Sequence, residues 1–281
     1  MPDWSIWTFK FAEGRLPIDF VRGTPVQSNL GHVDVPMIFS LLQSTAGERV
    51  LVDTGFASGD SMTGPGFRKF VRSDEVLRRH DIDPATIDTL VLTHLHFDHA
   101  GNIAAYPKAQ IYLQRAEYDG WIAAIAEFGH LGTSKDRWAF SSLDINNFEA
   151  LEAARAEGRV TLLDGDFHLR DGITCRLARD THSFGIQWLE VDTAQGAFAL
   201  AGDICYSYYG VERMWPPGYL QGNAWNILRE MARIKAVAGD DLARLLPGHD
   251  MDIFSRHPSG DSHGVRVAQL NLAAGHSSLI G

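Results

Sequence analysis

The chain has 281 residues, of which 45% are hydrophobic and 21% are charged, so it is long enough for a sizeable core and ordinary in composition for a globular protein. Its net charge of -10, without a long basic run, argues against nucleic acid as a substrate or partner. Its two cysteines, Cys175 and Cys205, give neither a disulfide framework nor a CxxC metal pair. Without a membrane-length apolar run or a basic signal-peptide start, the sequence predicts a cytoplasmic protein with no membrane partner.

The first part of the chain is rich in predicted strands. Segments 5–12 and 35–44 carry many β-branched and aromatic residues, and segment 49–56 predicts a third strand that ends in a turn at Gly55. The following stretch, 57–70, is rich in glycine and serine and predicts a long loop, after which Ser73 is expected to cap a short helix. Two more strands are expected at 87–92 and 109–114.

The rest of the chain repeats this order of strands and helices. A helical segment is predicted over about 115–158, with a break near 129–134. Strands are then expected at 159–163, 173–179, 184–191 and 196–203, followed by a helix that ends at Gly239 and a short strand before His249. No repeat, linker or domain boundary is visible, so we expect one domain over 1–281 with the helical segment as an insertion. Two strand-rich halves with helices favour an α/β fold, a four-layer αββα sandwich of two mixed sheets.

The segment THLHFDH, residues 93–99, places three histidines and an aspartate directly after an apolar strand. Such polar groups are costly unless they are satisfied, so the segment predicts a metal site, an acid–base site or a solvated histidine-rich loop. His94 and His96 cannot share a helix face, but both can point at one place from an extended or turning segment. Imidazole and carboxylate are preferred ligands of zinc-like divalent ions, which favours the metal site.

Three further polar residues end apolar strands in the second half. His182 follows ITCRLARDT, Asp203 follows AFALAG and His249 follows ARLLPG, so each is expected at the mouth of a sheet. With the first four residues they make five histidines and two aspartates, a set that fits two metal ions with a shared bridge.

With these marks, and with LVDTG at 51–55, GD at 202–203 and PGHD at 247–250, the chain resembles the metallo-β-lactamase superfamily over about residues 35–255. The resemblance implies the αββα fold and two divalent ions, with zinc expected. Its implied ligands are His94, His96 and His182 for one ion, Asp98, His99 and His249 for the other, and Asp203 as the bridge. It also implies that Asp53 orients ligands from a buried position behind them.

One position departs from the family pattern. The family usually has a Pro-Gly turn before the isolated ligand histidine, whereas this chain has Asp180-Thr181, and Gly185 follows three residues after His182. On the sequence alone, Asp180 or His168 competes with His182 as the ligand.

Within the superfamily the chain is most similar to the N-acyl homoserine lactone lactonases, through HLHFDHAG, QRAEYD, DICY and the closing GHD. That resemblance implies a quorum-quenching type of reaction, the opening of a lactone ring by a hydroxide that the two ions provide at neutral pH. It gives Tyr206 the role of steadying the oxyanion and Asp98 that of passing a proton to the leaving alkoxide. Tyr208 or Tyr209 would take the place of Tyr206 if the register differs.

The substrate pocket is expected to be aromatic, since rings are frequent in segments 118–130 and 206–225. The candidate lining residues are Phe97, Trp121, Phe128, Tyr209 and Trp225. The loop 56–70, with Phe56, Met62 and Phe67, is interpreted either as a lid or as the contact of a homodimer. The expected partner is a small-molecule substrate.

Two other functions remain open on the sequence. The same metals suit a different carbonyl substrate, such as a cyclic amide or imide, a β-lactam or a thioester. The last alternative is a non-catalytic binding protein, but such a protein is expected to lose ligands and all seven are present.

Overall fold

The computed structural model describes residues 3–22, 30–57, 66–132, 138–218, 220–239 and 241–280. Its larger sheet has eight strands in the order β14-β15-β1-β2-β3-β5-β7-β8. Their bounds are Ser259–Ser262 for β14, Val265–Asn271 for β15, Trp4–Pro17 for β1, His32–Ser44 for β2, Arg49–Val52 for β3, Thr89–Val91 for β5, Gln110–Gln114 for β7 and Val160–Leu163 for β8. The last four of these strands pair in parallel and the others antiparallel, so the sheet is mixed.

The second sheet has five strands in the order β13-β12-β11-β10-β9. They are β13 (Leu245–Pro247), β12 (Gly196–Gly202), β11 (Gly185–Thr193), β10 (Ile173–Arg179) and β9 (Phe167–Arg170). Only β12 and β13 pair in parallel. Two further short strands, β4 (Gly55–Phe56) and β6 (Ala100–Gly101), pair with each other.

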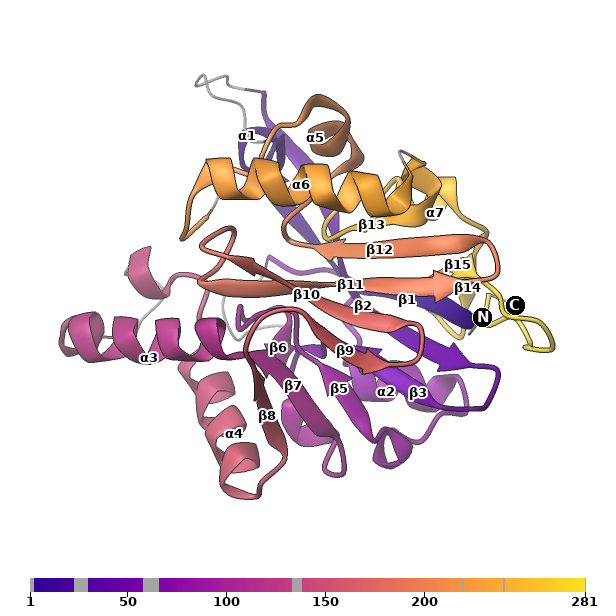
Figure 1. Cartoon of the computed structure of the whole chain (residues 1–281), viewed down its shortest axis with the longest axis horizontal. Helices are drawn as coiled ribbons and strands as arrows, with labels where there is room; N and C mark the ends of the chain where they lie inside the picture. The colour runs from indigo at the N-terminus through magenta and orange to yellow at the C-terminus, as the bar shows by residue number, and fades with distance from the viewer. Residues whose placement is uncertain are drawn as a thin grey trace.

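Helices cover the outer faces of the sheets. Helix α6 (Ala224–Ala238) runs along β12 of the smaller sheet (Figure 1), while α2 (Ser73–Arg79), α3 (Arg115–Phe128) and α4 (Ile145–Ala156) belong to the other half. The short helices are α1 (Ile18–Arg22), α5 (Tyr208–Arg213) and α7 (Ile253–Arg256). The predicted αββα sandwich of two mixed sheets is confirmed. Among the described residues no helix is long and apolar enough to cross a membrane.

The large sheet is buried on both faces, because alternate residues of its central strands enter different cores. In β2, Phe39 and Leu41 pack with the outer helices, whereas Ile38 and Leu42 pack with the second sheet. The second core continues through the small sheet to the inner face of α6, so the large sheet separates two apolar cores.

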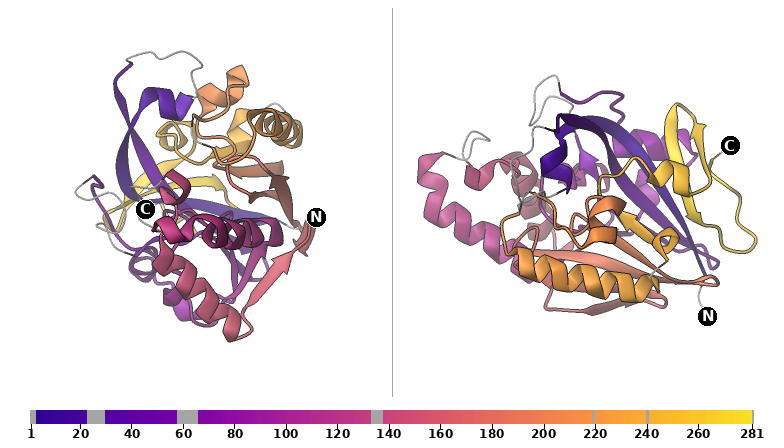
Figure 2. Two further views of the ribbon diagram at one scale, coloured as in Figure 1. Left: turned by 90° about the vertical axis from the view of Figure 1, so that its left-hand side faces the viewer. Right: turned by 90° about the horizontal axis from the view of Figure 1, so that it is seen from above.

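Strands β1 and β2 are much longer than their neighbours. Their paired ends reach past the sandwich toward α1, as both views of Figure 2 show. This extension brings residues from the N-terminal end of the chain over the loops that follow β5, β12 and β13.

The structure corrects several local predictions. The expected strand 49–56 breaks at Asp53, whose φ of 63° lies in the left-handed region, and Gly55 then begins β4. Ser73 does not cap α2: it is the first helical residue, and its hydroxyl donates to the Thr54 carbonyl at 2.6 Å. The hairpin of β14 and β15 was not predicted. Residues 58–65, including Met62, lie outside the described part of the chain.

Candidate metal centre

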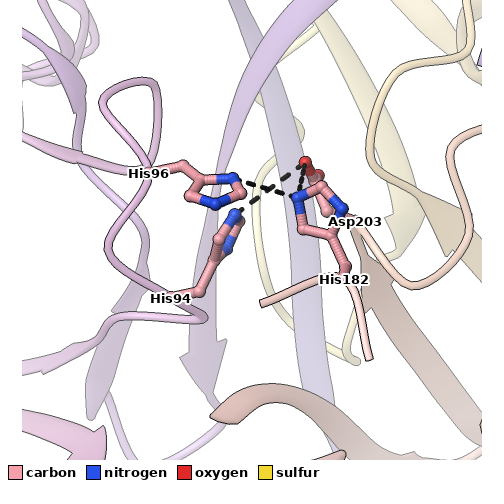
Figure 3. Close-up of side chains that lie close together, drawn as sticks. All are labelled: His94, His96, His182 and Asp203. Atoms are coloured by element: carbon pink, nitrogen blue, oxygen red, sulfur yellow. Dashed lines mark hydrogen bonds and ion pairs between the residues drawn. The ribbon is translucent and has the colours of Figure 1, made fainter. Parts of the chain in front are cut away.

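All seven predicted ligand side chains lie together at the ends of β5, β10, β12 and β13. They form two buried groups, His94, His96, His182 and Asp203 in one (Figure 3) and Asp98, His99 and His249 in the other. Within each group the candidate ligand atoms lie within 4.8 Å of one another. Parallel pairing of β12 with β13 sets Gly202 opposite Pro247 and so brings Asp203 beside His249.

Asp203 stands between the two groups. Its Oδ2 atom is 3.3 Å from His182 Nε2 and 3.2 Å from His249 Nε2, and its Oδ1 atom is 3.3 Å from His99 Nε2. Gly248 is required here, since a Cβ at that position would lie 2.4 Å from Asp203 Oδ1. The glycine of the PGHD segment therefore makes room for the candidate bridging carboxylate.

Asp53 holds the histidine loop from behind. Its carboxylate accepts hydrogen bonds from His99 Nδ1 at 2.8 Å and from the Thr93 amide at 2.7 Å. The Thr93 hydroxyl donates to the same carboxylate at 2.9 Å, so it accepts from His94 Nδ1 at 3.0 Å. These bonds place protons on the outer nitrogens of His94 and His99, and leave the Nε2 lone pairs facing the site.

The outer nitrogens of two other rings also face polar groups of the chain. His249 Nδ1 lies 3.1 Å from the Pro36 carbonyl, which can only accept, so this nitrogen carries the proton. His96 turns its Nε2 toward Gln221 Oε1 at 3.1 Å and its Nδ1 toward His182 Nε2 at 3.0 Å. The inner nitrogen of neutral His249 is therefore an acceptor, as are those of His94 and His99.

Several ligand atoms that face the site have no hydrogen-bond partner in the described part of the chain, as expected for atoms that bind a metal ion. Among the described residues, His94 Nε2, His99 Nε2 and Asp203 Oδ1 are buried without a hydrogen-bond partner. When the rings are neutral these are three buried acceptors without donors, which is costly, and a cation satisfies all of them at once. The two buried His/Asp groups thus indicate divalent metal ions.

The pKa shifts of two histidines in the cluster also agree with a metal site. Burial lowers the pKa of His94 well below its usual range, with His99 and His96 adding to the effect, so this ring stays neutral and able to bind a metal. Burial acts in the same direction on His99, but the carboxylates of Asp203, Asp98 and Asp53 outweigh it and raise its pKa well above its usual range. The carboxylates therefore stabilise a positive charge at this place, and divalent ions would provide it.

The turn before His182 forms without the usual Pro-Gly pair. Asp180 adopts the left-handed region with φ of 51°, which aspartate tolerates, and its amide donates to the Phe184 carbonyl. The Thr181 hydroxyl donates to the Ala178 carbonyl at 2.8 Å. His182 is thereby fully buried in the cluster. Of the two competing candidates, Asp180 is exposed at the turn and His168 is exposed on β9.

Glu117 is a buried residue beside the site that the sequence analysis did not single out. Its buried carboxylate accepts from the amides of Leu95 and Gly185 and from the Ser183 hydroxyl, at 3.0, 2.8 and 2.7 Å. It thus ties the histidine loop to the turn that carries His182. Only the motif QRAEYD points to it in the sequence, because its partners come from separate loops.

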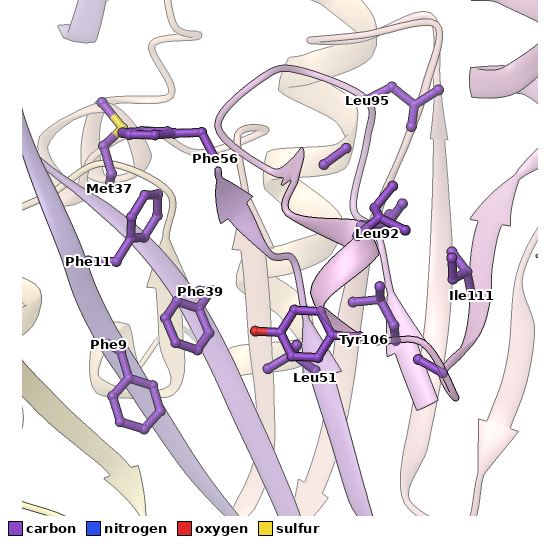
Figure 4. Packing of buried hydrophobic residues seen from close by; sticks show 14 of the residues in the cluster. Phe9, Phe11, Met37, Phe39, Leu51, Phe56, Leu92, Leu95, Tyr106 and Ile111 are labelled. Atoms are coloured by element: carbon purple, nitrogen blue, oxygen red, sulfur yellow. The ribbon is translucent and has the colours of Figure 1, made fainter. Parts of the chain in front are cut away.

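A cavity of about 250 Å³ opens beside the cluster, lined by Leu16, Phe20, Met37, Phe67, His96, Phe97, Asp98, Ser141, Ser142, Asp203, Tyr206 and His249. Met37 lies next to Phe56 and Phe11 in Figure 4, so one wall of the cavity continues into the core. Tyr206 is buried. The centroid of its ring lies 4.9 Å from the His249 ring centroid and 5.4 Å from the His182 ring centroid. The placement of Asp98 and Tyr206 at the cavity suits their predicted roles.

Of the predicted lining aromatics, only Phe97 reaches this cavity. Trp121 is fully buried behind His96, and its indole donates to Glu117 at 2.9 Å. Phe128 lines a separate surface hollow, and Tyr209 stacks between Arg22 and Arg213 in another. Trp225 is 69% exposed on α6. Of the predicted lid or dimer loop, Phe56 is buried in the core and Phe67 lines the cavity.

Known proteins are similar to this chain in sequence and in fold. The N-acyl homoserine lactonase AttM of Azorhizobium caulinodans is 24% identical over 250 residues, which cover 81% of this chain and 87% of that protein. The crystal structure of a quorum-quenching N-acyl homoserine lactone lactonase superposes with a TM-score of 0.66 at 22% identity, over 88% of this chain and 92% of the other. The structure of AidC, a dizinc quorum-quenching lactonase, superposes with a TM-score of 0.61 at 16% identity. The match covers 88% of this chain and 87% of AidC.

The family itself follows from the sequence match. Residues 34–249 match the model of the Metallo-beta-lactamase superfamily. Every candidate ligand lies within this range. The comparisons confirm the predicted superfamily and its enzyme class, metal-dependent hydrolase. The protein belongs to the metallo-β-lactamase superfamily.

Proposed function

We propose that the protein is a dizinc hydrolase that opens a lactone or a related cyclic ester. The observation that carries this proposal is the buried seven-residue cluster beside a largely apolar cavity that contains Tyr206. The N-acyl homoserine lactonases among its relatives, and a dizinc lactonase with the same fold, support both the substrate class and the metal.

The cavity suits a neutral substrate with an apolar part. Its lining includes Leu16, Phe20, Met37, Phe67 and Phe97, and no lysine or arginine among the described residues. A substrate carboxylate or phosphate would therefore find no ammonium or guanidinium group among the described lining residues. A lactone with an acyl substituent is neutral and buries apolar surface, which is favourable by about 25 cal/mol per Å².

The chemistry divides between the ions and the chain. When bound, two divalent ions supply a hydroxide nucleophile near neutral pH and draw electron density from the carbonyl. The hydroxide adds to the carbonyl carbon, the ring C–O bond then breaks, and the alkoxide takes up a proton to give a hydroxy acid. The Tyr206 hydroxyl is proposed to donate to the oxyanion. Asp98 is proposed to take the proton of the added hydroxyl group and pass it to the alkoxide, which leaves a carboxylate and an alcohol.

The substrate class is tested with a panel of lactones, β-lactams, cyclic imides and thioesters, presented to the zinc-loaded protein. We expect lactones to have the highest kcat/KM. Efficient hydrolysis of another class with inert lactones would defeat the lactonase proposal and leave a metallohydrolase of a different substrate. No hydrolysis of any member would favour a binding protein.

Substitution of Tyr206 by phenylalanine is expected to lower kcat while both metal ions stay bound. The loss of one oxyanion donor costs about 2.7–4 kcal/mol, or roughly 10²–10³-fold in kcat. The ring packing against His249 and Phe20 is kept, so folding is preserved. Stopped-flow kinetics with metal analysis of the same sample checks this, and an unchanged kcat would mean that the Tyr206 hydroxyl has no part in the reaction.

A further inference from the structure

Gln221 connects two of the loops that supply ligands to the first metal group, the loop of His96 and the turn of His182. Its backbone N–H donates to the His182 carbonyl at 3.0 Å, and its side-chain oxygen Oε1 lies 3.1 Å from His96 Nε2. The neighbouring amide of Gly222 donates to the Thr181 carbonyl at 2.9 Å, so this loop runs against the His182 turn. A Cβ at Gly222 would lie 2.2 Å from the Asp180 carbonyl carbon, which shows how close the two loops approach.

The two ways of orienting the Gln221 amide have opposite consequences for His96. With the oxygen toward the ring, His96 Nε2 must donate, and the Nδ1 lone pair then faces His182 Nε2 at 3.0 Å and the space between the ligands. With the amide reversed, its N–H groups would face His96 Nε2, which would have to accept. The proton would then sit on Nδ1, and this nitrogen could not bind a metal.

With the oxygen toward His96, the Gln221 Nε2 group lies 3.5 Å from Ser142 Oγ, which can accept from it. Ser183 Oγ lies 3.1 Å from Gln221 Oε1 and 2.7 Å from Glu117 Oε1. Because a hydroxyl has one proton, and the shorter contact with a carboxylate takes it, Ser183 could instead accept from a reversed amide. The orientation of the amide is therefore coupled to which nitrogen of His96 carries the proton.

We infer that Gln221 is a positioning residue that selects the metal-binding tautomer of His96, and this inference rests on the proposed metal centre. Gln221 does not line the cavity beside the metals and instead faces the hollow between α3 and the segment 138–139. It therefore acts through His96 rather than by touching substrate. Outer groups of this kind commonly change metal affinity by about 10- to 100-fold when they are removed.

The test compares zinc affinities in competition with a chelator. Gln221→Met keeps the length of the side chain but removes the acceptor, and we expect one of the two ions to bind about 10- to 100-fold more weakly. Gln221→Glu keeps an acceptor at the same reach and is expected to bind both ions as the wild type does. The matched control is Gln269→Met, which removes a similar bond, from the Trp7 indole to Gln269 Oε1 at 3.3 Å, on β15.

A second readout reports the tautomer itself. In the zinc-loaded wild type, ¹⁵N NMR of the imidazole rings should show His96 protonated at Nε2 and bound through Nδ1. A wild-type affinity for Gln221→Met, or protonation of His96 at Nδ1 in the loaded wild type, would overturn the inference. Equal weakening by Met and Glu would also overturn it, because the effect would then come from shape rather than from the acceptor.

The experiments distinguish a failure of the role of Gln221 from a failure of the proposed lactonase function. If the loaded wild type binds two ions but hydrolyses no lactone, the function fails while the affinities and the ring protonation still decide the role of Gln221. If the wild type binds no divalent ion, the metal centre fails and the role of Gln221 fails with it.

Discussion

Substitution of Asp203 by alanine is expected to abolish hydrolysis and to weaken the binding of both ions. Its carboxylate is the one group within 3.3 Å of ring nitrogens from both ligand sets, His182 and His99, among the described residues. Polarisation of the carbonyl and formation of the nucleophile by the metals supply several kcal/mol, and a loss of about 4 kcal/mol corresponds to roughly 10³-fold in kcat/KM.

The apo protein should tolerate this change better than the loaded protein does. Burial opposes the charge of Asp203, but His249 and His99 outweigh it and hold the pKa of the carboxyl well below its usual range, so alanine lowers the stability of the apo fold without abolishing it. We expect circular dichroism of the apo variant to show the wild-type fold, while elemental analysis shows depleted metal. Asp192→Ala, at an exposed position on β11, is the control. A variant with two tightly bound ions and wild-type kcat/KM would show that Asp203 is not the bridge.

The second large effect is expected for His182→Ala. His182 is fully buried, and its Nε2 atom lies 3.0 Å from His96 Nδ1 and 3.3 Å from Asp203 Oδ2. Removal of the ring takes one of three imidazoles from the first metal group, so we expect loss of one ion and of nearly all turnover, on the order of 10³-fold.

Its matched control is His168→Ala, the same substitution at an exposed position on β9. This variant should keep two ions and the wild-type kcat. Because a cavity at a buried site also lowers stability, metal content is measured at a temperature where the apo variant remains folded. Metal loss in His168→Ala with full occupancy in His182→Ala would reverse the ligand assignment.

The metal cluster was predictable because its signal is local. Each candidate ligand follows an apolar strand, and strand ends at one edge of a sandwich converge, so the residues could be chosen without knowing the register. His182 was the weakest prediction, since the turn before it depends on Asp180 in the left-handed region and on Glu117 bonds that arise only in the folded chain.

The cavity walls were much less predictable. Leu16 and Phe20 reach the cavity because the paired ends of β1 and β2 extend beyond the sandwich, and Phe67 comes from the segment after β4. No local pattern encodes such approaches. Trp225 could have been excluded from the sequence, because the buried stripe of α6 is Ile227, Met231 and Ile234, and Trp225 lies outside that helical spacing.

The most direct test of the account is product analysis after reaction of the zinc-loaded protein with an N-acyl homoserine lactone in ¹⁸O-labelled water. The account predicts a ring-opened acid with one ¹⁸O atom in its carboxylate, no product after chelation, and recovery when zinc is returned. Intact lactone in the presence of protein that holds two zinc ions, or label in the hydroxyl instead of the carboxylate, would contradict it.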